Sequence, residues 1–415
     1  MKTTNSIFSA YEPEKIVVKK VECIELAATN VLLEGKLRSV RLQDNKVSRE
    51  YSLLLTEKFL YYAKNTTNAS MVPSILTSKA FIRLEWLRVS FFSLLAGSGR
   101  YTYYIQLNNS NRKAVFCTDD LDHYCKWKQH LSKLLINTDF DGKFKVGRRL
   151  GKGGSASVYK ASEMKTGRVV ACKKFNKAEI MINNTIEALV NEVEALRRMK
   201  GHPHVVELEE VHETEQFVYI VTEVLEGGMI FKEGRKYKEA DVLMVARSLL
   251  LTAASLEEAG IVHRDLKPSN IHFKYASSPL KENVIKVLDF GISVIADKKQ
   301  TLGKISGTLG YMAPEAFTKL NYSTMSSKSD IFSIGVILYN AVSGTRLFYS
   351  ESKVQRRILN CQAKINFYTT ALSNISPRCK ITSVTTPQES AQARCFRTPI
   401  RRRGPNCTNF RTRAR

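Results

Sequence analysis

The stretch that decides the fold is VHRDLKPSN, residues Val262 to Asn270. It places a carboxylate, an ammonium group and an amide, those of Asp265, Lys267 and Asn270, within six positions. Apolar residues precede it at helical spacing and share one face: Val242, Ala246, Leu249, Leu250, Ala253 and Leu256. The pattern predicts a long amphipathic helix followed by a loop that carries the three polar groups.

Three further segments follow this loop. Nineteen residues beyond Asn270, KVLDFGIS places Asp289 where a short apolar strand gives way to a loop, and a carboxylate is a ligand that Mg²⁺ prefers. SGTLGYMAPE then supplies Thr308 and the run that ends in Glu315. The last of these segments, DIFSIGVILYNAVSG from Asp330, is apolar on nearly every side and predicts a buried helix.

Upstream, FKVGRRLGKGGSASVYKA from Phe144 reads as strand, glycine-rich turn and strand. Glycines in such a turn let the backbone approach phosphate oxygens closely. Lys173 lies fifteen residues after Val158, in the strand VVACKKF. The next segment, TIEALVNEVEALRRM, predicts a helix with Glu192 beside an apolar stripe formed by Ile186, Leu189, Val193 and Leu196.

In this order and at these spacings, the segments resemble the eukaryotic-type protein kinase family, and the turn GKGGSASVYKA is similar to that of the calcium/calmodulin-dependent group. The resemblance implies an α+β, bilobal kinase fold over residues 144–366, with a β-rich N-lobe and a helical C-lobe. It also implies a transferase that uses ATP and Mg²⁺ to phosphorylate protein substrates. Hydroxyl-specific members carry a lysine at the position of Lys267, so serine and threonine are the expected targets.

The resemblance assigns roles residue by residue. Asp265 accepts or orients the proton of the attacking hydroxyl, Lys267 neutralises charge on the phosphoryl group, and Lys173 pairs with Glu192. Lys174 and Glu194 are the alternatives for that pair. Asn270 and Asp289 are the expected Mg²⁺ ligands. The expected nucleotide-binding set is Leu150, Gly151, Lys152, Gly153, Gly154, Ser155, Ala156, Ser157, Val158, Lys173, Thr222, Glu223 and Leu225.

A smaller domain is predicted before the kinase segment, over residues 31–137, after an extension of residues 1–30. Two β-like runs broken by QDNK predict a hairpin, and the runs FLYYAK, FIRLEWLRVSFF, YTYYIQL and KAVFC predict further strands. A helix capped by Asp119 or Asp120 follows, and its apolar face consists of Leu121, Tyr124, Trp127, Leu131, Leu134 and Leu135. Short strands followed by one helix with a buried Trp resemble the pleckstrin-homology domain, a small β-barrel with a C-terminal helix.

The partner of this domain stays open. Lys36, Arg38, Arg41 and Arg49 provide basic groups for an anionic phospholipid headgroup. Glu50, however, stands where lipid-binding members usually have Arg or Lys, so a protein-interaction or autoinhibitory module is an equal alternative. Residues 138–143 are polar and predict a short linker.

The C-terminal segment, residues 367–415, departs from the kinase pattern. It has no helical period, and its ten Arg or Lys against one Glu account for much of the net charge of +25. We expect a basic, disordered tail that replaces the end of the C-lobe or contacts anionic membrane. No arginine to pair with Glu315 is identifiable, so the C-lobe is predicted to be incomplete. A non-catalytic nucleotide-binding scaffold is therefore the alternative function.

Composition narrows the remaining classes. The hydrophobic fraction of 43% and charged fraction of 25% are those of globular proteins, and no apolar run is long enough for a bilayer. The eight cysteines form no C-x-x-C pair, which argues against zinc and a disulfide framework. We expect a cytoplasmic monomer, free or peripheral at a membrane, and nucleic-acid binding is not favoured. Arg264 suggests phosphate control of the loop that contains Thr301 and Ser306, although a constitutively ordered loop is equally compatible.

Overall fold

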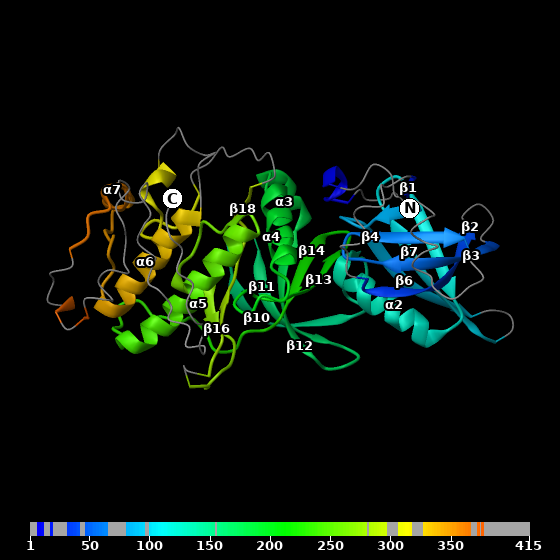
Figure 1. Ribbon diagram of the computed structural model, residues 1–415, viewed down its shortest axis with the longest axis horizontal. Helices are drawn as coiled ribbons and strands as arrows, with labels where there is room; N and C mark the ends of the chain where they lie inside the picture. The colour runs from blue at the N-terminus through cyan, green and yellow to red at the C-terminus, as the bar shows by residue number, and fades with distance from the viewer. Residues whose placement is uncertain are drawn as a thin grey trace, which may run out of the picture.

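The computed structural model describes residues 6–11, 17–19, 31–41, 46–64, 80–95, 99–153, 156–279, 282–296, 306–317, 327–366, 372–373 and 375–376. Gly154, Ser155, Thr301 and the segment after Ser376 lie outside the described residues. The described part is elongated, with a β-rich unit at one end, a helical lobe at the other and a second β-rich lobe between them (Figure 1). Among the described residues, no helix combines the length and apolar character needed to cross a bilayer.

The N-terminal unit consists of strands followed by one helix. Its elements are β1 (Val17–Lys19), β2 (Leu33–Arg41), β3 (Lys46–Leu55), β4 (Phe59–Lys64), β5 (Ala80–Arg83), β6 (Arg88–Leu95), β7 (Tyr101–Asn108), β8 (Lys113–Thr118) and α2 (Leu121–Leu134). The hairpin predicted around QDNK is present, because β2 pairs antiparallel with β3. The order is β1-β5-β4-β3-β2-β8-β7-β6. Within the described residues β5 and β6 are not paired, so the sheet is open and the predicted closed barrel is not observed.

Two details of this unit differ from the sequence-based expectations. The run FIRLEWLRVSFF is not one strand, because the chain turns between β5 and β6 at Trp86, where φ is +60°. Asp120 caps α2 by accepting a hydrogen bond from the backbone N–H of His123 at 3.0 Å. The helix buries Trp127 completely, but Leu121, predicted on its apolar face, is half exposed at 51%. Leu121 is the first residue of the helix.

The second β-rich lobe continues the same sheet. Its elements are β9 (Ile136–Asn137), β10 (Phe144–Lys152), β11 (Ser157–Glu163), β12 (Val169–Asn176), α3 (Lys177–Asn183), α4 (Ile186–Arg198), β13 (Leu208–Glu213) and β14 (Phe217–Thr222). The strand β9 pairs in parallel with β6 on one edge and with β13 on the other, which joins the two lobes into one sheet of 14 strands.

Residues 138–143 are more than a polar connection. Phe140 in this segment is fully buried and stacks on Tyr219, with ring centroids 3.7 Å apart. The N-terminal residues 6–11 also pack, because Phe8 is fully buried against Trp86 with ring centroids 5.1 Å apart. The expected extension and linker thus each contribute an aromatic side chain to the core.

The third part is mainly helical. It contains α5 (Glu239–Glu258), β15 (Ile261–Val262), β16 (Ile271–Phe273), β17 (Ile285–Val287), β18 (Val294–Ile295), α6 (Ser327–Ser343) and α7 (Lys353–Gln362). The helices α5 and α6 lie side by side (Figure 1), and α6 is buried on nearly every side, as its composition predicts. Leu372 and Ile375, which the sequence assigned to the tail, are buried in the same core. Ser376 bonds to Glu239, so the packed chain extends beyond residue 366.

Candidate active site

The loop between β15 and β16 is held in shape by one buried carboxylate. Asp330, 1% exposed, accepts hydrogen bonds from the backbone N–H groups of His263 and Arg264, each at 2.8 Å. Arg264 has a φ of +70°, a left-handed conformation that costs a non-glycine residue about 1–3 kcal/mol. The two hydrogen bonds that Asp330 accepts stabilise this conformation, and the next residue is Asp265.

Asp265 is the centre of a polar cluster. Its Oδ1 accepts a hydrogen bond from Thr308 Oγ1 at 2.6 Å, and its Oδ2 accepts from Lys267 Nζ at 2.7 Å and Asn270 Nδ2 at 3.0 Å. Lys267 Nζ also donates to Thr308 Oγ1 at 2.8 Å. The structure thus brings together the three residues predicted from VHRDLKPSN. It adds Thr308, which the sequence placed only in the segment before Glu315.

A second charged cluster connects β12 and α4 with Asp289. Lys173 Nζ on β12 lies 2.7 Å from Glu192 Oε1 on α4 and 2.8 Å from Asp289 Oδ1. Burial lowers the pKa of Lys173, but the two carboxylates outweigh it, so the net shift is upward and the ammonium stays charged. Burial raises the pKa of Asp289, but Lys173 outweighs burial and the net shift is downward. Both groups are therefore ionised at neutral pH.

The neighbouring alternatives face elsewhere. Glu194 forms an ion pair with Arg198 at 2.8 Å, and the Lys174 ammonium lies 3.7 Å from the centroid of the Phe217 ring. On the alternating faces of β12, only one of two consecutive lysines can face Glu192. The structure therefore selects Lys173 and Glu192 over the two alternatives.

The backbone at Asp289 is also fixed by packing. Phe290 is fully buried, and its ring centroid lies 4.7 Å from that of His263. His263 Nε2 in turn bonds to the Leu288 carbonyl oxygen at 2.9 Å. Asp289 itself has a φ of +60°. The buried aromatic contact and this hydrogen bond connect the loop of Asp265 with the loop of Asp289.

The glycine-rich turn joins β10 and β11. Gly153 N–H donates to the Ala156 carbonyl oxygen at 2.8 Å, and Val158 on β11 pairs with Lys173 on β12. A Cβ atom added at Gly151 would meet no atom of the described residues within 4 Å. Leu150, Lys152 and Ser157 lie on the same hairpin. Gly154 and Ser155, predicted to bind nucleotide, lie outside the described residues.

The segment after β14 links the lobes and carries a charge cluster that the sequence did not suggest. Thr222 ends β14 and Leu225, half-buried, follows it. Between them the Glu223 carboxylate accepts from Lys286 Nζ at 2.8 Å, Lys274 Nζ at 2.9 Å and the backbone N–H of Glu207 at 2.9 Å. Although burial opposes it, these bonds hold the pKa of Glu223 below its ordinary value. The sequence places Glu223 only in the expected nucleotide-binding set, and these ion pairs of its side chain are an additional feature.

Asn270 and Asp289 offer oxygen atoms of the kind that Mg²⁺ prefers. Asn270 uses its amide nitrogen for Asp265, which leaves its side-chain oxygen as a ligand, and the Asp289 side chain is 49% exposed. Across the described residues, no group of three His, Cys, Asp or Glu side chains could hold a metal alone. Substrate phosphate oxygens would therefore have to complete the coordination, as Mg²⁺ commonly requires.

Two predictions for the C-lobe remain: the partner of Glu315 and the candidate phosphorylation sites. Glu315, for which the sequence offered no arginine, accepts a hydrogen bond from Ser329 Oγ at 3.1 Å. Of the two candidate phosphorylation sites, Thr301 lies outside the described residues, and Ser306 begins the described segment 306–317.

Comparison with known proteins agrees with this geometry. The family model described as protein kinase domain matches residues 144–395. CDPK-related kinase 4 of Arabidopsis thaliana is 35% identical over 251 residues, which cover 58% of this chain and 41% of the relative. Calcium/calmodulin-dependent serine/threonine-protein kinase 1 of Oryza sativa subsp. japonica is 36% identical over 230 residues, or 53% of this chain and 37% of the relative. The chain thus spans less than half the length of these relatives. Since the family model covers more than half of the chain, the chain belongs to the protein kinase family.

Proposed function

We propose that the chain is an ATP-dependent protein serine/threonine kinase. The observation that carries the proposal is the cluster of Asp265, Lys267, Asn270 and Thr308, in which three donors converge on one carboxylate. A carboxylate offers about four lone-pair sites, so one site on Asp265 Oδ1 remains for a substrate hydroxyl. The names of the relatives, which include a serine/threonine-protein kinase, support the same substrate class.

The proposed step is a single displacement. The substrate hydroxyl oxygen forms a bond to the γ-phosphorus, the bond from that phosphorus to the bridging oxygen breaks, and ADP leaves. Asp265 orients the hydroxyl and accepts its proton, while the Lys267 ammonium stabilises charge on the transferred group. Lys173, fixed by Glu192, binds the α- and β-phosphates. Mg²⁺, held by Asp289 and Asn270, would neutralise phosphate charge.

The rival function is a nucleotide-binding scaffold without catalysis. It is motivated by the lack of a helical period in residues 367–415, of which the family model matches only the part up to residue 395. Phosphate transfer from ATP to a generic basic protein distinguishes the two, with Asp265→Asn as the matched variant. We expect transfer by the natural chain and a loss of about 10²-fold or more in the variant, with unchanged ATP affinity. Equal transfer by both would refute the catalytic assignment, and ATP binding without transfer by either would support the scaffold.

For the N-terminal unit we propose a pleckstrin-homology-like domain that targets the kinase to a membrane surface or a partner protein in the cytoplasm. The strand order followed by α2, with Trp127 fully buried, supports this proposal. Arg38 is engaged by Asp119 at 2.7 Å and lies opposite Glu50 in the hairpin, which reduces the charge available to a headgroup. Lys36 and Arg49 would then be the headgroup ligands.

Vesicle sedimentation of the full chain tests the lipid form of this proposal. The charge-reversed double variant Lys36→Glu/Arg49→Glu should lose binding to phosphoinositide vesicles, whereas Arg112→Glu, in the turn between β7 and β8, should keep it. If the natural chain does not sediment with these vesicles, the lipid form is refuted and the partner form remains. The basic residues beyond 376 require the same comparison with a chain that ends at Ser376.

A further inference from the structure

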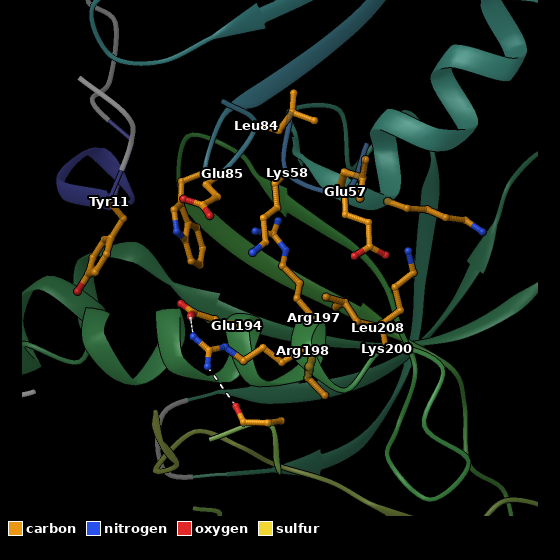
Figure 2. A pocket seen from close by; sticks show the side chains of 15 residues that line it. Tyr11, Glu57, Lys58, Leu84, Glu85, Glu194, Arg197, Arg198, Lys200 and Leu208 are labelled. Atoms are coloured by element: carbon orange, nitrogen blue, oxygen red, sulfur yellow. Dashed lines mark hydrogen bonds and ion pairs between the residues drawn. The ribbon is translucent and has the colours of Figure 1, made fainter. Parts of the chain in front are cut away.

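A cavity of about 690 Å³ lies between the N-terminal unit and α4, away from the Asp265 cluster. One wall is the turn that contains Leu84, Glu85 and Trp86, and the facing wall is the end of α4 from Glu194 to Arg198. Figure 2 shows Lys58 and Glu85 on the strand side opposite Arg197 on the helix side. The volume is within the range of small-molecule sites, about 300–1,000 Å³.

Arg197 is the unusual residue of this cavity. Its guanidinium lies over the Trp86 ring, 5.1 Å from the centroid. Its Nε and Nη2 atoms are buried and have no hydrogen-bond partner among the described residues. Burial lowers the pKa of Arg197 to about 10, and the charges of Glu194 and Glu85 offset only part of this effect. The side chain is therefore a desolvated cation at neutral pH.

The acids of the cavity do not neutralise this cation. Glu194 is paired with Arg198 at 2.8 Å, and Glu85 lies 3.5 Å from Arg83. Three further lysines line the cavity, and within the described part of the chain none of them forms an ion pair: Lys58, Lys133 and Lys200. Glu57 is the one remaining acid of the lining. The cavity thus carries an excess of positive charge around a buried guanidinium.

The rest of the lining is apolar. Leu84, Leu134, Leu196 and Leu208 face the cavity together with the Trp86 ring. Trp86 has a φ of +60°, a strained conformation for a bulky residue, and its ring also contacts those of Phe8 and Tyr11, with centroids 5.1 and 6.0 Å away. Strained residues of this kind cluster at binding and switch regions because the surrounding structure must hold them.

We propose that this cavity binds a small organic phosphate, whose anionic group pairs with Arg197 and the surrounding lysines and whose apolar body packs on Trp86 and the leucines. A dianion is favoured over a neutral ligand because a charged acceptor forms stronger bonds to a guanidinium. Glu192 and Arg197 share α4, so an occupied cavity holds the helix that supports Lys173. Binding itself does not depend on phosphate transfer, and the inference stands apart from the proposed function.

The test is calorimetric titration of the full chain with 1-naphthyl phosphate at neutral pH, with the nucleotide site filled by a non-hydrolysable ATP analogue. We expect binding by the natural chain, affinity about tenfold weaker or worse in Arg197→Gln, and no change in the surface control Arg112→Gln. The uncharged 1-naphthol has the same apolar body and should not bind. Exchange of amide hydrogens in residues 186–198 should slow when the phosphate is added to the natural chain.

Lys200→Gln is a second test that does not depend on the folding of Arg197→Gln, because Lys200 is exposed at the cavity and its replacement should not disturb the fold. The affinity of Lys200→Gln for 1-naphthyl phosphate should be about threefold weaker than that of the natural chain. Absence of binding to the natural chain, equal binding by Arg197→Gln, or equal binding of 1-naphthol would each overturn the proposal. Weaker binding in both variants, with normal binding in Arg112→Gln, would support it.

Discussion

Replacing Asp330 by asparagine should destabilise the loop that carries Asp265 without creating a cavity in the core. The natural carboxylate accepts one backbone N–H on each oxygen, both at 2.8 Å. Asparagine has the same shape but only one acceptor, so either the His263 or the Arg264 amide loses its bond and faces an N–H₂ group instead. We therefore expect one charge-assisted hydrogen bond to be lost and the other to be weakened.

The magnitude follows from two opposing effects. A hydrogen bond to a buried charged group contributes about 1.5–3 kcal/mol. Burial raises the pKa of Asp330 although the His263 and Arg264 groups lower it, so the carboxylate is costly to desolvate and its removal recovers part of the loss. We expect a net loss of about 2 kcal/mol in the free energy that holds the loop, which corresponds to about 30-fold faster local amide exchange.

Hydrogen exchange of the peptide 261–266 measures this loss directly, and the turnover number for phosphate transfer measures its effect on Asp265. Turnover should fall by about 10-fold or more, because Arg264 can leave its strained conformation at φ +70°. Ser333→Ala is the matched control on the same helix, since its hydroxyl bonds to the Tyr311 carbonyl at 2.9 Å and not to the loop. Natural exchange and turnover in Asp330→Asn, or equal changes in Ser333→Ala, would refute the reasoning.

Three further perturbations have defined outcomes. Thr308→Val keeps the shape but removes the hydroxyl between Lys267 and Asp265, so turnover should fall by about 10-fold with little change in ATP affinity, and a change in affinity alone would contradict this role. Glu192→Gln should lower the affinity for ATP but change the free energy of unfolding little, because Asp289 remains 2.8 Å from Lys173. Isothermal titration measures the affinity, and urea unfolding measures the stability. Glu223→Gln should lower stability by about 1–2 kcal/mol at neutral pH. Because the folded-state pKa of Glu223 is below 4.5, the natural chain should lose this advantage as acid unfolding experiments pass below about pH 4.5, and a pH-independent difference would count against the ion pairs.

The sequence predicted which polar residues of VHRDLKPSN lie together better than it predicted the connections around them. Asp265, Lys267 and Asn270 are close in sequence, so a single loop brings them together whatever the distant structure is. Thr308 joins them from 43 residues after Asp265. A hydroxyl in a polar, glycine-containing run has no periodicity that would mark it, and only the folded segment shows its two hydrogen bonds.

The errors in the N-terminal unit have a common cause. The run from Phe81 to Phe92 contains no glycine or proline, so local propensity indicates one strand. The turn forms at Trp86 because Phe8 and Arg197, both remote in sequence, pack on its ring. The burial of Phe140 was likewise not predicted, because its polar neighbours make the segment resemble a linker. Tertiary packing overrode local sequence preference at each of these positions.

The two-residue strand β9 has a consequence for how the lobes are aligned. Each of its edges is occupied, by β6 through Arg88 and Val89 and by β13 through Val211 and His212. Adding one residue before Ile136 would move one partner along the other by about 3.3 Å and exchange the sides of Ile136 and Asn137. The register between the strands of the N-terminal unit and those of the kinase lobe is thus set by one two-residue strand. We expect insertions in surface loops that do not flank β9 to leave this register unchanged.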